Sequence, residues 1–161
     1  MAKHMSDWLK IALPGFFGLM TAVIAAFFSA RWAVQRVFRE KWWERKEKAY
    51  SEIIDSLHDM IRYSALMADI ELHIGDEKPE HPKKKEFGER YSAAYWRILK
   101  MTDIGAFVIS EKAEAVLKGL QKRPRLKWEE NPPWEIYEED EKHYREALVA
   151  IRAIARKELG V

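Results

Sequence analysis

The feature that most constrains this chain is an uncharged, apolar run near its start. The run extends from Ile11 to Ala30 and is bounded by Lys10 and Arg31. As a helix rising about 1.5 Å per residue, it would span about 30 Å, the thickness of a bilayer's hydrocarbon core. The rest of the chain is strongly charged, and the overall mean hydropathy is only −0.43. The sequence therefore predicts a transmembrane helix over residues 11–30 and a cytosolic helical domain over residues 31–161.

Two other interpretations fit this run less well. It is longer than the apolar part of a usual signal peptide, and Phe28 stands where a cleavage site needs a small side chain. A buried core helix is disfavoured because a small domain can hardly enclose a helix that is apolar on all sides. Residues 1–10 form a short flank, in which residues 1–4 resemble a cloning remnant and are left out of the functional argument.

The charges on either side of the run predict its orientation. Lys3 and Lys10 precede it, whereas a larger basic set follows it: Arg31, Arg36, Arg39, Lys41, Arg45, Lys46 and Lys48. Because cytoplasmic flanks of membrane helices carry the excess of Lys and Arg, the C-terminal side is expected in the cytoplasm. The expected location is a bacterial inner membrane, with the N-terminus outside.

Small residues recur every four positions within the run. They are Gly18, Ala22, Ala26 and Ala30. Such a stripe lets membrane helices approach closely, so it is a candidate self-association face and the chain a candidate homo-oligomer. The alternative is that Gly and Ala are simply common in membrane helices.

The remainder shows helical periodicity and no convincing strand pattern. From Arg31 to about residue 74 there is no Pro or Gly, and an apolar stripe contains Ile53, Leu57, Met60, Ser64 and Met67, with Leu72 beside it. Further helices are expected around residues 87–101, after the N-cap Ser110, and over residues 135–158, with Gly160 as the stop. The predicted fold class is all-α: three long helices and one short helix in a bundle.

Three segments resemble a group of uncharacterised bacterial membrane proteins. The segments are Lys41–Met60, Asp103–Leu120 and Ile151–Gly160. That group consists of small single-pass proteins with a cytosolic helical domain. The resemblance implies the same architecture and an inner-membrane setting, and it carries no functional residues across.

The sequence contains no motif for catalysis, a metal or a cofactor. There is no cysteine, and neither a phosphate-binding glycine loop nor a Gly-x-Ser-x-Gly elbow is present. Histidines and carboxylates between His73 and His81 lack the spacing of metal ligands and are interpreted as a solvated loop. Basic residues are the remaining candidates, as contacts for anionic lipid or an anionic ligand: Arg31, Arg36, Arg39, Lys118, Lys122, Arg123, Arg125 and Lys127.

The favoured hypothesis is therefore a membrane-anchored, non-enzymatic scaffold or interaction protein that self-associates or binds a protein partner at the inner face of the membrane. The alternative is a membrane effector of a bacterial antiviral or stress system, whose cytosolic domain senses a signal such as a nucleotide. Nucleic acid is a less favoured partner, and an enzyme is the least favoured function.

Overall fold

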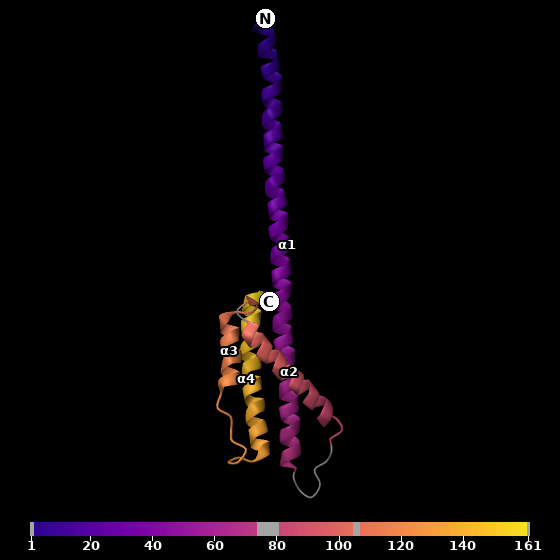
Figure 1. Cartoon of the computed structure of the whole chain (residues 1–161), viewed down its shortest axis with the longest axis vertical. Helices are drawn as coiled ribbons and strands as arrows, with labels where there is room; N and C mark the ends of the chain where they lie inside the picture. Colours follow the sequence, from indigo (N-terminus) through magenta and orange to yellow (C-terminus); the bar gives the residue numbers. More distant parts are fainter. Residues whose placement is uncertain (1, 74–80, 105–106, 161) are drawn as a thin grey trace. The chain divides into compact units, whose positions relative to one another are not determined.

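The described part of the chain is entirely helical. The computed structural model describes the backbone of residues 2–73, 81–104 and 107–160, and the side chains of residues 20–73, 81–103 and 107–160. Within these ranges there are four helices and no strand (Figure 1): α1 (Ala2–Leu72), α2 (Lys84–Ile104), α3 (Glu111–Lys122) and α4 (Pro133–Leu159). The predicted all-α class is confirmed, with α3 as the one short helix among those described.

The chain divides into two compact units, Met1–Trp42 and Trp43–Val161. In the first unit, every described side chain of α1 from Met20 to Trp42 is exposed. The large apolar ones include Phe27 at 63%, Trp32 at 73% and Phe38 at 71% of full exposure. None of the described helical stretches is both long and apolar enough to cross a bilayer. Residues 11–19 of the predicted membrane run, Gly18 among them, lie outside the described side chains.

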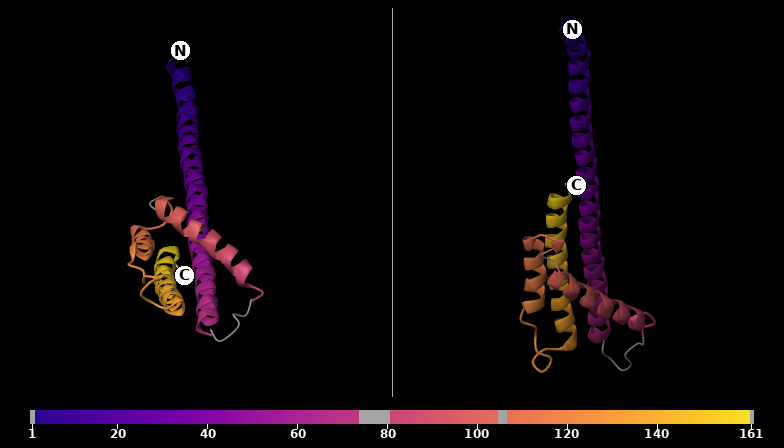
Figure 2. Two further views of the ribbon diagram at one scale, coloured as in Figure 1. Left: turned by 60° about the horizontal axis from the view of Figure 1, so that its bottom comes forward. Right: turned by 45° about the horizontal axis from the view of Figure 1, so that its top comes forward.

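The second unit is a bundle in which α4 runs antiparallel to the last part of α1. Contacts along the two helices follow opposite orders: Lys46 with Glu158, His58 with Arg152, and Tyr63 with Tyr137. Helix α3 lies beside α4, and α2 crosses the last part of α1 obliquely (Figure 2). Each helix therefore buries one face in a common core, as the periodicity predicts.

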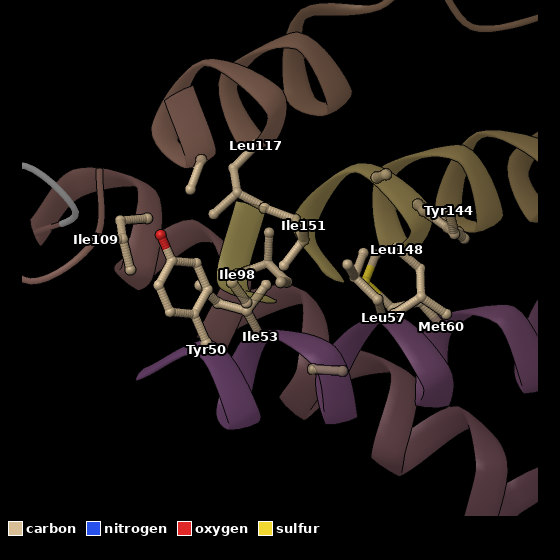
Figure 3. Packing of buried hydrophobic residues seen from close by; sticks show 14 of the residues in the cluster. Tyr50, Ile53, Leu57, Met60, Ile98, Ile109, Leu117, Tyr144, Leu148 and Ile151 are labelled. Atoms are coloured by element: carbon tan, nitrogen blue, oxygen red, sulfur yellow. The ribbon is translucent and has the colours of Figure 1, made fainter. Parts of the chain in front are cut away.

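The core is an apolar cluster to which all four helices contribute (Figure 3). Helix α1 buries Ile53 and Leu57 completely, and Ile98, Leu117 and Ile151 from the other helices pack with them. The predicted stripe of Ile53, Leu57, Met60, Ser64 and Met67 is confirmed, since all five residues are buried. The expectation that Leu72 lies inward was wrong, because it is the last residue of α1 and is 56% exposed.

The helix ends follow local chemistry. Ser110 caps α3, because its Oγ accepts a hydrogen bond from the Ala113 backbone N–H at 3.3 Å. Helix α4 begins with Pro133, where a missing N–H costs nothing, and ends at Gly160. Gly160 has a φ of 74° and donates its N–H to the Arg156 carbonyl, which closes the last turn. These signals place α3 and α4 as expected.

A polar contact ties the two ends of the bundle unit together. Lys46 Nζ lies 2.7 Å from Glu158 Oε2, and the Tyr50 hydroxyl donates to the same oxygen at 2.8 Å. The Tyr50 hydroxyl also lies 3.4 Å from Ser110 Oγ. Burial by itself opposes the charged form of Glu158, but the hydrogen bonds from Lys46, Ser110 and Tyr50 together with the Lys46 charge outweigh it, so the pKa of Glu158 is lowered.

The Glu158→Gln variant should lose stability in a pH-dependent way. A carboxylate whose native pKa lies below its ordinary value of 4.5 stabilises the fold above that value, and this contribution is lost as the pH falls through the native pKa. We expect the free energy of unfolding of the wild type to exceed that of the variant near neutral pH and to converge with it in acid. Urea denaturation at several pH values measures this. Exposed Glu138→Gln is the control, and a difference that does not change with pH contradicts the expectation.

Candidate binding groove

A polar groove lies on the outer surface of the bundle unit, formed by α1 and α2. It has a volume of about 410 Å³ and is lined by Asp55, His58, Asp59, Arg62, Arg90 and Arg97. We call this the arginine groove. Its four α1 residues are spaced by three, one and three positions, so they share one helix face. That face is opposite to the face that carries Ile53 and Leu57 into the core.

Helix packing brings these side chains together. Arg90 Nη2 lies 2.5 Å from Asp59 Oδ1, with the Asp59 side chain only 17% exposed. Arg97 Nη1 approaches the Oγ of the fully buried Ser56 at 3.4 Å. Arg152 reaches in from α4, with its Nη2 2.8 Å from His58 Nε2. Because a guanidinium can only donate, His58 Nε2 is the acceptor in this contact.

The charges of the groove do not balance. Arg62, Arg90 and Arg97 line the groove and Arg152 contacts its edge, whereas the carboxylates beside them are those of Asp55, Asp59 and Glu86. Of these four arginines only Arg90 makes ion pairs with described residues, namely Asp59 and Glu86. Arg97 contacts a hydroxyl and Arg152 contacts an imidazole. The arginine groove is thus a positively charged surface whose donors are only partly used.

The basic residues singled out in the sequence lie elsewhere. Arg31 and Arg39 are exposed on the first unit, and Arg36 pairs with Glu40 within its own helix at 2.9 Å. In the second unit, Lys118 pairs with Glu114 and Lys127 pairs with Glu130. Lys122 and Arg125 are exposed.

Arg123, by contrast, is turned inward. Its side chain is 8% exposed, its Nη2 contacts Asp140, and its guanidinium carbon lies 5.1 Å from the centre of the Tyr144 ring. Its Nε and Nη1 are buried without a hydrogen-bond partner. Contact with the ring offsets part of that cost through a cation–π interaction. Because these donors are shielded from solvent, we assign Arg123 a structural role.

Tyrosines surround this ion pair. The hydroxyls of Tyr91 and Tyr144 are 3.0 Å apart, and the rings of Tyr63 and Tyr91 lie 4.6 Å apart, centre to centre. Burial raises the pKa values of Tyr91 and Tyr144, and it raises the pKa of Tyr137 to about 12. All three remain protonated at neutral pH and can donate hydrogen bonds. This cluster is a packed part of the interior rather than an acid–base site.

The sequence did not allow the arginine groove to be predicted. Its lining residues come from two helices, α1 and α2, that are separated by a long connection, so no local motif joins them. The only local signal was the polar face of α1 opposite its apolar stripe, and that pattern is also typical of an ordinary solvated face. No group of three metal-ligating side chains gathers anywhere in the described residues.

Comparison with protein-family models, curated proteins and solved structures finds no match for this chain. The resemblance to single-pass bacterial membrane proteins therefore stays a prediction. What the protein does must be inferred from its own residues.

Removing Arg123 alone should destabilise the bundle. In the Arg123→Leu variant, the largely buried Asp140 would lose its partner, at a cost of about 3 kcal/mol in the free energy of unfolding. Burial already raises the pKa of Asp140 even with Arg123 present. The double variant Arg123→Leu/Asp140→Leu should recover much of the loss, because it leaves no unpaired charge.

Urea denaturation measures these differences, with exposed Arg125→Leu as the control, expected within about 0.5 kcal/mol of wild type. If the free energy of unfolding of Arg123→Leu equals that of the wild type, the ion pair does not stabilise the bundle.

Proposed function

We propose that this protein is a membrane-anchored helical interaction protein, in which the apolar run around residues 11–30 holds the bundle unit at the inner face of a bacterial membrane. The observation that carries the proposal is the exposed apolar surface of α1. From Met20 to Phe38 it exposes nine large apolar side chains, including Val23, Ile24, Phe27 and Phe28. A surface of this kind needs an apolar environment that the described chain does not supply.

The bundle unit supports the proposal that the protein binds a partner or a ligand. The residues of its core all lie within residues 43–161. Its outer surface carries arginine side chains with unused donors at the arginine groove. Such donors favour a module that binds a ligand or a partner. The orientation, with this unit in the cytoplasm, rests on the basic residues after Ala30.

Membrane anchoring is tested by placing charge inside the apolar run. The full chain expressed in bacteria should stay with the membrane fraction after carbonate washing. Ile24→Arg combined with Phe27→Arg should shift it to the soluble fraction, because each arginine at the centre of a membrane helix costs about 3 kcal/mol of insertion free energy. Val37→Arg, which lies beyond the run, is the matched control. A wild-type chain found in the soluble fraction would refute the anchor.

Self-association through the small-residue stripe is the second expectation of this proposal. Crosslinking in native membranes should capture oligomers of the wild type. Ala22→Leu with Ala26→Leu should reduce them at least about fivefold, because bulk on the stripe keeps the helices apart. Ala25→Leu adds one leucine on a neighbouring face and should have a smaller effect than either Ala22→Leu or Ala26→Leu alone. Equal oligomer yield from all variants would remove the stripe's role and leave the anchor untouched.

A further inference from the structure

The arginine groove has unused donor capacity at its centre. Arg62 makes no hydrogen bond or ion pair with any other described residue, and Arg97 has only the long contact to Ser56. Both side chains are exposed to solvent. A guanidinium carries five N–H donors in a planar fork, so two such groups in one groove leave several donors available to an incoming acceptor.

The groove is built on rigid parts of the bundle. Arg62 follows the buried Ile61 on α1, and Arg97 precedes the buried Ile98 on α2. The Arg90–Asp59 and Arg152–His58 contacts fix the edges from α2 and α4. An ordinary solvated helix pairs its charges at i, i+4 along one helix, as Arg145 does with Glu141. Here arginines of α1 and α2 line one groove, and Arg152 of α4 contacts His58 at its edge.

We propose that the arginine groove binds a phosphate group carried by a small molecule or by a lipid head group. Guanidinium groups match the oxygens of phosphate with paired, charge-assisted hydrogen bonds. The four arginines exceed the three carboxylates Asp55, Asp59 and Glu86 by one formal positive charge, which has the sign needed to attract a phosphomonoester, whose charge is about −1.5 to −2 near neutral pH. The ligand therefore supplies the counter-charge that the described residues lack.

The carboxylates narrow the class of ligand. Asp55 has no partner among the described residues and lines the same groove, so it can accept a hydrogen bond from a hydroxyl or amino group beside the phosphate. The volume of about 410 Å³ holds more than a phosphate alone. The chemistry that fits is a compact phosphomonoester with neighbouring donor groups.

This inference concerns the unit 43–161 by itself and does not depend on membrane anchoring. The full chain, purified in a non-ionic detergent, is titrated with glycerol 3-phosphate and separately with dihexanoyl phosphatidic acid, with binding followed by calorimetry. The first probe carries a phosphate beside free hydroxyls, and the second presents the same phosphate on a lipid. Binding of glycerol 3-phosphate identifies a soluble phosphomonoester site. Binding of phosphatidic acid alone identifies a lipid head-group site.

The variants connect binding to the groove. Arg62→Gln with Arg97→Gln should weaken the Kd for the bound probe at least about tenfold, since two charge-assisted contacts are lost. Arg156→Gln removes one exposed arginine outside the groove and should change the Kd less than about twofold. If the double variant does not fold, the single variant Arg62→Gln replaces it. Arg62 is exposed and has no partner among the described residues, so this variant should fold, and it should weaken the Kd about fivefold. The proposal is overturned if neither probe binds, or if Arg156→Gln weakens binding as much as the groove variants do.

Discussion

The structure of the bundle depends on the burial of one face of α1 between Tyr50 and Met67. Ile53 and Leu57 at its centre are completely buried, and residues from α2, α3 and α4 all pack against this stripe. Burying a side chain of this size contributes about 1.5 to 3 kcal/mol, so a few such positions are worth the net stability of a small domain. Helix α3 also packs against α4 and against α2. Tyr50 on the same face also connects the helices through polar contacts, because its hydroxyl contacts Ser110 at the start of α3 and Glu158 at the end of α4.

Much of the helix arrangement could be predicted, because apolar periodicity and helix-end residues depend only on the local sequence. The apolar period identified the buried face of α1, and Ser110 and Gly160 marked helix ends that the structure confirms. The misplacement of Leu72 has a simple cause. The apolar period of the sequence continues to Leu72, but a side chain is buried only where another element covers the helix. Leu72 is the last residue of α1 and is exposed.

The charged residues could not be predicted in the same way, because charge acquires its role from tertiary neighbours. Arg123 and Lys122 are adjacent in a basic connection, yet one is buried against Asp140 and Tyr144 while the other is exposed. The arginine groove shows the reverse effect. Arg62 and Arg97 are unremarkable within their own helices and become a possible site only when α2 crosses α1. Helical periodicity tells which side faces the core, but not which exposed side chains meet.

One helix meets two opposite physical demands along its length. Near its end α1 is amphipathic, and every large apolar side chain on its buried face finds a protein partner. From Met20 to Phe38 the same helix exposes nine large apolar side chains. Because the hydrophobic effect scales with apolar area left in water, this stretch is costly until lipid or another chain covers it. The proposed anchor would remove that cost by surrounding the stretch with lipid.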